Sequence, residues 1–444
     1  MPDTYSPKRI SVRRRFVHLM FRYFYSIIII VLLPLIIFAY RKKLTHNDAL
    51  NGRSFKERFG LLPKSFQANG IHIHCVSVGE VNASIGLIKQ MQIDYPELVI
   101  TVTTSSTTGA VHAKNMLGES VQHCYLPFDI PFCIYLFYRR IQPKLVLVTE
   151  VEVWPNLMAY CYKNNIPTIL TNARMSFKSL KKYKKLKWLF RPTFRQFNVI
   201  CAQSSESFNN FVAFGVYKKQ LKLSNNMKFD LTLDSRDVEL GQALQAKLNP
   251  NLRPVFLAAS THEPEEKIIL DAFKKLKECI PELMLFIVPR HPQRFEDVHQ
   301  IIKATGTKVI RHSKTKHSFK SDDWDCVLID AMGKLKACYS ICNLAFVGGS
   351  FAKKGGHNAL EAALFSKPAI MGPSIFNNPS ICEILKEKDA LAVLKNESEL
   401  LGIAKEWLLN ADLSKELGAK GKNVIAENAG AIEKTMQIIR SVMQ

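Results

Sequence analysis

A glycine-rich loop follows the apolar run 344–347 and precedes a segment with a helical pattern. It reads VGGSFAKKGGHNALEAALF over residues 347–365. Its glycines let the backbone approach a ligand closely, and the N–H groups at a helix start favour an anion. The spacing is neither that of a Walker loop nor that of a dinucleotide-binding loop. The loop therefore indicates a phosphate-bearing ligand of another kind.

Two polar residues of this loop have two possible roles. Asn358 and Glu361 have N-x-x-E spacing, which is that of a variant capping box serving only the helix. Alternatively, Glu361 accepts hydrogen bonds from ribose hydroxyls while the N–H groups of the loop hold a phosphate. Spacing alone leaves both interpretations open.

Two further polar segments also follow apolar runs. In ASTHEPEE, Ser260 or Thr261 could cap a helix, or their hydroxyl groups could contact a phosphate. In PRHP, Arg290 could form a surface ion pair, or it could grip a phosphate through paired hydrogen bonds. His291 beside it is more often a structural residue than a base.

A carboxylate near the start of the chain's globular part is a candidate base. Glu80 closes the segment HCVSVGE and precedes a helical pattern. It could simply favour the helix N-terminus, which would lower its pKa. In an active site it could instead take the proton of an attacking hydroxyl, which contributes roughly 10²–10⁴-fold to a rate. Glu150 and Glu152 would point to opposite sides of an extended strand, so at most one of them would face such a site.

Residues 174–191 form a segment with basic residues and no acidic ones, interleaved with aromatic residues and leucines. A solvated helix face is the simplest interpretation. An amphipathic basic segment near a membrane would instead meet lipid phosphates. RNA binding is disfavoured because no signature of an RNA-binding module accompanies it, and we expect no nucleic acid partner.

Apolar runs that could form strands alternate with helix-length segments from residue 70 onward. The first series comprises 71–77, 98–103, 145–149, 167–170 and 198–202, and the second comprises 255–260, 283–288, 325–329, 344–347 and 368–371. Such runs are typical of parallel sheets covered by helices on both faces. They predict an α/β protein with two doubly wound, Rossmann-like domains facing a cleft. The polar segments above follow these runs, at the strand ends where ligands bind in open parallel sheets.

The length and the charge of the chain agree with this organisation. Its 444 residues exceed what one core usually serves, and 61 Lys and Arg against 38 Asp and Glu give a net charge of +23, which calls for an anionic partner. Residues 23–40 carry no charge and have basic residues on both sides, which predicts a membrane anchor over a cleaved signal peptide. We therefore expect a basic tail and anchor over 1–43, an N-terminal domain over 44–235 and a C-terminal domain over 236–444. The last helix could pack back on the N-terminal domain.

The topology of the anchor is open from charge alone. Basic residues before the apolar run would hold the N-terminus in the cytoplasm and export the body, whereas those after it favour retention. Pro34 in mid-run would suit a segment that dips in and returns. The ten cysteines include no Cys-x-x-Cys pair and no cluster with zinc spacing, which favours reduced thiols, a body facing the cytoplasm and no metal site.

Together these segments resemble the bacterial 3-deoxy-D-manno-octulosonic acid (Kdo) transferases of lipopolysaccharide biosynthesis. The matching segments occur in order over about residues 50–400 and read SVGEVNAS, TEVEVWPN, NARMS, NMKFD, ASTHEPEE, VPRHPQRF and FVGGSFAKKGGHNALEAA. Two departures occur. DAMGKL over 330–335 has Ala331 and Lys334 where the family usually has Thr and Glu, and HNALEAA has Ala where proline is usual.

The resemblance implies a GT-B fold that binds the acceptor on its N-terminal domain and CMP-Kdo on its C-terminal domain. It implies inverting transfer of Kdo to lipid IVA, without a metal or other cofactor, at the cytoplasmic face of the inner membrane. Glu80 matches the catalytic base. The residues expected to bind the donor are Arg290, Asn358 and Glu361, with Gly355 and Gly356 near its phosphate and, by extension, Ser260 and Thr261. The residues expected to bind acceptor or donor anions are Arg174, Lys178, Lys181, Lys182 and Lys228.

Two alternative functions are compatible with the sequence. One is another GT-B nucleotide-sugar transferase acting on a lipid acceptor. The other is a non-catalytic, membrane-attached protein that binds anionic lipid through residues 174–191, and such a protein would need neither Glu80 nor Glu361.

Overall fold

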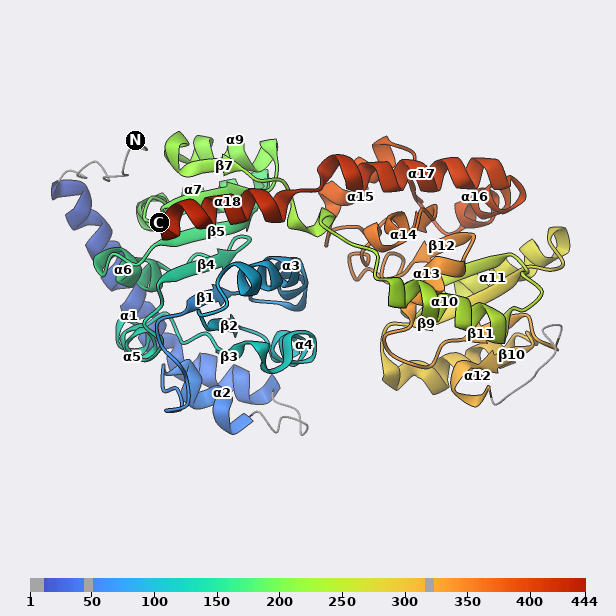
Figure 1. The fold of residues 1–444 in the computed structure, drawn as a ribbon, viewed down its shortest axis with the longest axis horizontal. Helices are drawn as coiled ribbons and strands as arrows, with labels where there is room; N and C mark the ends of the chain where they lie inside the picture. The colour runs from blue at the N-terminus through green and yellow to red at the C-terminus, as the bar shows by residue number, and fades with distance from the viewer. Residues whose placement is uncertain (1–11, 44–50, 316–322) are drawn as a thin grey trace. The chain divides into compact units, whose positions relative to one another are not determined.

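The structure is a computed structural model that describes residues 12–43, 51–315 and 323–444. The described chain forms two compact units (Figure 1). The first extends to Asp230 and includes Ala429–Gln444, and the second comprises Leu231–Asn428. The last helix, α18 (Ala431–Met443), packs on α3 (Val78–Asp94) within the first unit. Residues 1–11 of the predicted basic tail lie outside the described residues.

The first unit is built on a parallel sheet of seven strands in the order β3-β2-β1-β4-β5-β6-β7. The strands are β1 (Ile71–His74), β2 (Ile100–Thr104), β3 (Gln122–Tyr125), β4 (Leu145–Thr149), β5 (Thr168–Ala173), β6 (Val199–Ala202) and β7 (Leu221–Leu223). Alternate residues of β4 enter opposite cores, Val146 and Val148 on one face and Leu145 and Leu147 on the other. This burial on both faces explains why the strand reads as an uninterrupted apolar run.

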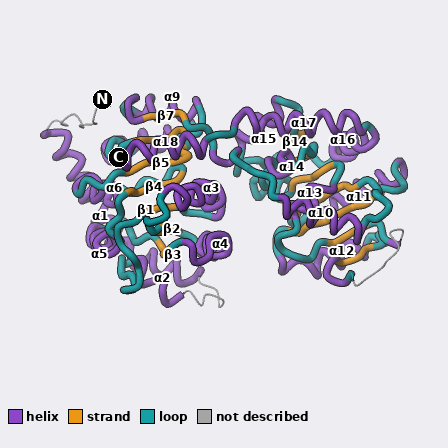
Figure 2. Tube along the Cα trace, viewed as in Figure 1, coloured by secondary structure: helices purple, strands orange, loops and turns teal. Residues whose placement is uncertain are grey.

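Helices cover both faces of this sheet (Figure 2). One face packs against α3, α4 (Thr107–Leu117) and α18. The helices on the other face are α5 (Pro131–Ile141), α6 (Pro155–Lys163), α7 (Phe177–Lys185), α8 (Lys187–Phe194) and α9 (Ser205–Phe214). A short helix, α2 (Asn51–Arg58), contacts β3.

The second unit repeats the architecture with seven parallel strands in the order β10-β11-β9-β8-β12-β13-β14. The strands are β8 (Val255–Thr261), β9 (Met284–Pro289), β10 (Val309–Arg311), β11 (Cys326–Leu328), β12 (Leu344–Val347), β13 (Ala369–Met371) and β14 (Leu391–Val393). The helices are α10 (Ser235–Leu248), α11 (Glu265–Cys279), α12 (Phe295–Ala304), α13 (Leu335–Ile341), α14 (Leu360–Leu364), α15 (Pro379–Glu387), α16 (Ser398–Leu409) and α17 (Ala411–Asn428).

The strand orders confirm the predicted doubly wound units and show where their ligands should bind. Every strand run predicted from the sequence overlaps an observed strand. The order reverses between β1 and β4 in the first unit and between β8 and β12 in the second. Ligands of open parallel sheets bind at such switch points, beyond the carboxyl ends of the strands.

One helix of the described chain, α1 (Val12–Lys43), contains a segment long and apolar enough to cross a membrane, Val17–Phe38. It contacts α6 and α8 of the first unit. A polar contact fastens it there, because the amide of Asn156 donates to the hydroxyl of Ser26 at 2.9 Å. The carboxylate of Asp129 in turn accepts the N–H groups of Asn156 and Leu157 at the start of α6.

Candidate active site

Glu80 lies just beyond the carboxyl end of β1, at the switch point of the first unit. It is in the first turn of α3 and is only 9% exposed. Its Oε2 atom accepts the backbone N–H of Val76 at 2.6 Å. This bond holds one carboxylate oxygen against the chain that precedes the helix.

Burial controls the protonation of Glu80. Loss of solvation is the largest of the effects that raise its pKa to about 8, and the nearby carboxylates of Glu150 and Glu152 act in the same direction. The hydrogen bond from Val76 and the charge of Lys228 act in the opposite direction. The interpretation in which the helix start lowers this pKa is therefore wrong, because the cost of burying the charge is larger than the effect of the helix.

An acidic cluster surrounds Glu80. Glu150 follows β4 directly and has φ +60°, so the chain leaves the extended conformation there. Both Glu150 and Glu152 contribute to raising the pKa of Glu80. Because the chain is not extended here, the condition under which at most one of them would face the site is not met. Lys228 lies inside this cluster, with its Nζ atom 3.0 Å from Glu150 Oε1. The backbone N–H of Arg174, after β5, donates to the Glu150 carbonyl at 3.4 Å.

The three lysines predicted to meet anions lie on α7. Lys178, Lys181 and Lys182 are exposed, and no contact in the described part of the chain joins them to Glu80. Lys181 lies over the ring of Phe177, which is 60% exposed. The basic segment is also divided into α7 and α8, which meet at Leu186.

In the second unit, a buried carboxylate fills the glycine-rich loop after β12. Glu265, in the first turn of α11, is fully buried. Its Oε1 atom accepts the N–H groups of Ser350 and Phe351 at 2.9 Å and that of Ala352 at 3.4 Å. Its Oε2 atom accepts those of Gly349 at 2.8 Å and His262 at 2.9 Å. The protein thus places its own anion where a phosphate was expected.

Several other N–H groups of this loop are also used internally. Those of Gly356 and His357 donate to the carbonyls of Gly349 and Gly348, and that of Gly355 donates to the Ser374 hydroxyl. The N–H groups of all four glycines, Gly348, Gly349, Gly355 and Gly356, thus have partners within the protein, so the expectation that these glycines offer free N–H groups to a phosphate is wrong. Sequence spacing missed this because the partner carboxylate is 84 residues away from Gly349.

Gly355 and Gly356 are required by the shape of the loop. Both have positive φ, +87° and +69°. A Cβ atom on Gly355 would lie 2.6 Å from the Phe376 ring, and one on Gly356 would lie 2.3 Å from Met371 Cε. Local packing therefore explains these glycines, and their proximity to a donor phosphate stays a prediction.

Three residues expected to bind the donor lie around the carboxyl ends of β8 and β9. The hydroxyl of Thr261 is fully buried and has no hydrogen-bond partner among the described residues. The backbone N–H of Arg290 donates to the Thr261 carbonyl at 3.0 Å, which fixes the start of the arginine side chain beside it. Ser260 has φ +53°. Its carbonyl oxygen lies close to Gly348, since a Cβ atom added to Gly348 would be 2.4 Å from that oxygen.

Asn358 and Glu361 have different roles, which argues against the capping box. Asn358 Oδ1 accepts the N–H of Leu360, the first residue of the short helix α14, at 3.2 Å, whereas the N-cap residue is Ala359. The Glu361 carboxylate makes no hydrogen bond within the described ranges. Burial raises its pKa, and the charges of Lys336 and Arg290 lower it. Glu361 is thus a half-buried acceptor beside two cations, with its oxygens free for a ligand.

A histidine pair that the sequence reasoning missed borders these groups. The Nε2 atoms of His262 and His357 are 2.9 Å apart, and the ring of His291 packs edge-on against His262. Burial lowers the pKa of His262 and of His357 to about 4, so both are neutral near pH 7. Both residues belong to the polar segments identified above, which was the available signal. In the described chain, no group of three or more His, Cys, Asp or Glu side chains could hold a metal ion.

The sequence was compared with protein families and with curated proteins. Residues 53–231 match the family described as 3-deoxy-D-manno-octulosonic-acid transferase (kdotransferase). The chain is 36% identical over 428 residues to a 3-deoxy-D-manno-octulosonic acid transferase of Haemophilus influenzae, covering 96% of this chain and 99% of that protein. It is 31% identical over 396 residues to the enzyme of the same name from Rickettsia bellii, covering 88% of this chain and 91% of that protein.

Comparison with solved structures supports the fold alone. UDP-GlcNAc 2-epimerase of Neisseria meningitidis, bound to UDP-GlcNAc, matches with a TM-score of 0.57 at 12% identity, covering 85% of this chain and 100% of that one. A glycosyltransferase of Rickettsia africae matches with a TM-score of 0.54 at 13% identity, covering 85% and 99%. The predicted GT-B type of fold is confirmed by these matches together with the two seven-stranded parallel sheets.

Proposed function

This chain belongs to the 3-deoxy-D-manno-octulosonic acid (Kdo) transferase family, and on that premise we propose that it transfers Kdo from CMP-Kdo to lipid IVA with inversion. Membership makes it a glycosyltransferase of lipopolysaccharide biosynthesis, which confirms the family and the enzyme class predicted from the motifs. The donor, the acceptor and the roles of individual residues belong to the proposal.

The proposed reaction needs one base and one site for the leaving group. Glu80 takes the proton of the acceptor's primary hydroxyl as that oxygen attacks the anomeric carbon of Kdo. The bond from that carbon to the CMP phosphate oxygen breaks, and CMP departs with the bonding electrons. Attack opposite the departing phosphate inverts the anomeric centre.

The observation that carries the proposal is the buried carboxyl of Glu80 at the switch point of the first unit. Its pKa of about 8 is near the working pH, where a general base is most effective. In the second unit, the guanidinium of Arg290 and the unpartnered hydroxyl of Thr261 would hold the CMP phosphate. The carboxylate of Glu361 would accept the ribose hydroxyls. An assay of CMP-Kdo against UDP-sugars tests the donor directly: transfer from a UDP-sugar alone would contradict the proposal.

The Glu361→Ala variant should bind CMP about 10- to 100-fold more weakly, because two hydrogen bonds to a carboxylate are lost. Calorimetric titration with CMP measures this. Glu383→Ala, which removes an exposed glutamate of the same unit, is the control and should leave CMP affinity unchanged. Unchanged affinity in Glu361→Ala would limit Glu361 to a structural role.

The rate should rise with pH up to the pKa of Glu80. A general base must be ionised, so below about pH 8 the ionised fraction falls tenfold per pH unit, and kcat/KM should fall with it and level off above. Lys228→Met removes the charge that lowers this pKa and should move the limb to higher pH. Glu152→Gln removes a charge that raises it and should move the limb to lower pH. If the rise of kcat/KM with pH occurs at the same pH in both variants as in the wild type, ionisation of Glu80 is not its cause.

The surface of the first unit and α1 support the proposed acceptor and location. A helix that can cross a membrane and the exposed lysines of α7 suit a phosphorylated lipid presented at a bilayer. We place the catalytic units at the cytoplasmic face of the inner membrane, with Lys178, Lys181 and Lys182 toward the lipid phosphates. Arg174 and Lys228, beside Glu150, would guide the acceptor toward Glu80.

A further inference from the structure

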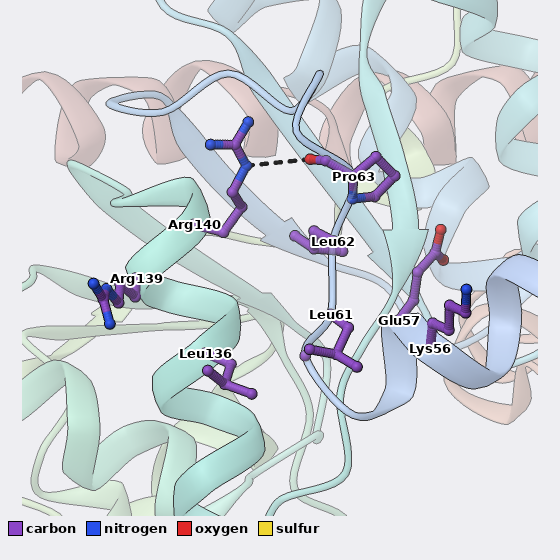
Figure 3. A pocket seen from close by; sticks show the side chains of 9 residues that line it. Lys56, Glu57, Leu61, Leu62, Pro63, Leu136, Arg139 and Arg140 are labelled. Carbon is purple, nitrogen blue, oxygen red and sulfur yellow. Dashed lines mark hydrogen bonds between the residues drawn. The ribbon is translucent and has the colours of Figure 1, made fainter.

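We propose that a pocket between α2 and α5 of the first unit binds a membrane phospholipid with an anionic head group, at a site separate from that of the acceptor. The pocket has a volume of about 900 Å³, enough for a head group, its glycerol and part of the acyl chains. Figure 3 shows leucines between the arginines of α5 and Lys56 of α2. The inference does not depend on the transfer reaction.

The charge of the pocket selects an anion. Its basic residues are Lys56, Arg139 and Arg140, and its one acidic residue is Glu57. The Glu57 side chain is buried, and its Oε2 atom accepts the backbone N–H of Tyr125 at 3.0 Å, so it serves the fold. Lys56 and Arg139 are exposed at the pocket, where their charges can meet a phosphate.

Arg140 shapes the pocket. Its Nε atom donates to the Pro63 carbonyl at 3.2 Å (Figure 3), and its guanidinium also donates to the Lys64 carbonyl. These bonds fasten the loop after α2 to α5. The loop contributes Leu61 and Leu62 to the lining, so the wall opposite the arginines is apolar.

Along the exposed face of α5, apolar side chains come first and arginines follow, as expected for a helix at a bilayer surface. Phe132, Tyr135, Leu136, Arg139 and Arg140 recur at the spacing of one helix face. Phe132 is 66% exposed and Tyr135 is 43% exposed, so apolar surface is left open in the first half of the helix. The two arginines follow in the second half. Apolar side chains beside arginines fit the boundary between acyl chains and phosphates.

The pocket is also tied to the helix that can cross a membrane. α1 ends at Lys43 and α2 begins at Asn51, so eight residue steps separate them, or at most about 29 Å when fully extended. α1 is held on the same unit by the contact between Ser26 and Asn156. A bilayer containing α1 therefore brings its head groups within reach of the pocket. Three cations and a leucine wall match an anionic phospholipid better than a soluble phosphate compound, which would leave the leucines uncovered.

The test uses the full chain in a neutral detergent, titrated with dioctanoyl phosphatidylglycerol or dioctanoyl phosphatidylcholine. The wild type should bind the phosphatidylglycerol at least about tenfold more tightly. Lys56→Gln/Arg139→Gln should lose about 30-fold of that affinity, because two basic contacts are removed. Lys89→Gln/Lys114→Gln changes two exposed lysines of the same unit by the same charge and should retain it. Equal losses in the two double variants, or none, would overturn the proposal.

Two further measurements distinguish a site for a lipid from a site for any small anion. Leu61→Asn keeps every charge and should also weaken phosphatidylglycerol binding, and inorganic phosphate should compete only weakly. Competition by phosphate at the affinity of the lipid would reduce the site to a simple anion site. Displacement of phosphatidylglycerol by lipid IVA in the wild type, lost in Lys56→Gln/Arg139→Gln, would identify the pocket as an acceptor site and contradict the proposal.

Discussion

Replacement of Glu80 by glutamine should abolish transfer and leave donor binding intact. The amide keeps the size of the side chain and can still accept the N–H of Val76, but it cannot take a proton from the acceptor hydroxyl. We expect kcat to fall by about 10²–10⁴-fold, which is the range for loss of a general base. Initial rates with saturating CMP-Kdo and lipid IVA measure the effect, and titration with CMP measures donor affinity.

Glu97→Gln is the matched control for this variant. Glu97 is an exposed glutamate of the same unit, and its replacement should leave both the rate and the affinity unchanged. Near-normal turnover in Glu80→Gln would refute the assignment of the base. A parallel loss of CMP affinity or of folded protein would assign Glu80 a structural role.

Replacement of Glu265 by alanine should remove the support of the loop after β12. Five backbone N–H groups would lose a buried acceptor, and each donor left unsatisfied in the interior costs about 1–3 kcal/mol. Because Arg290 and Glu361 lie around this loop, CMP binding should be lost together with stability. Denaturant unfolding and titration with CMP measure the two effects.

Glu263→Ala tests the neighbouring glutamate of the same segment. Glu263 is exposed, so its removal should change neither stability nor CMP affinity. Glu265→Gln adds a second comparison, because it keeps the volume but turns an N–H donor toward the N–H groups of the loop. We expect it to be destabilised as well. Wild-type unfolding and CMP affinity in both Glu265 variants would show that the loop does not need its internal anion.

The sequence indicated the central strands of both sheets because their burial on two faces leaves uninterrupted apolar runs. The four strands it missed, β3, β7, β10 and β14, are the edges of the two sheets. They have three or four residues each. Three of them include polar or basic residues such as Gln122, Lys222 and Arg311, and β14 is only three residues long. Edge strands need less apolar surface, so no pattern distinguishes them from loops.

The predicted strand ends indicated where the candidate site residues would lie, but the sequence did not indicate which residues surround them or how deeply they are buried. The spacing around Glu80 indicated a helix start, yet the pKa depends on burial and on Glu150, Glu152 and Lys228, which lie far along the chain. The same holds for Glu265, whose partners come from a loop more than 80 residues later. Periodicity and spacing report on neighbours in sequence and not on such contacts.

The measurement that tests the account most directly is the mass of the lipid after incubation of the full chain with lipid IVA and freshly made CMP-Kdo. We predict a product heavier by one or more Kdo residues, released CMP, and no product from Glu80→Gln in the same time. Unchanged lipid IVA with the wild-type protein, or equal product from Glu80→Gln, would contradict it.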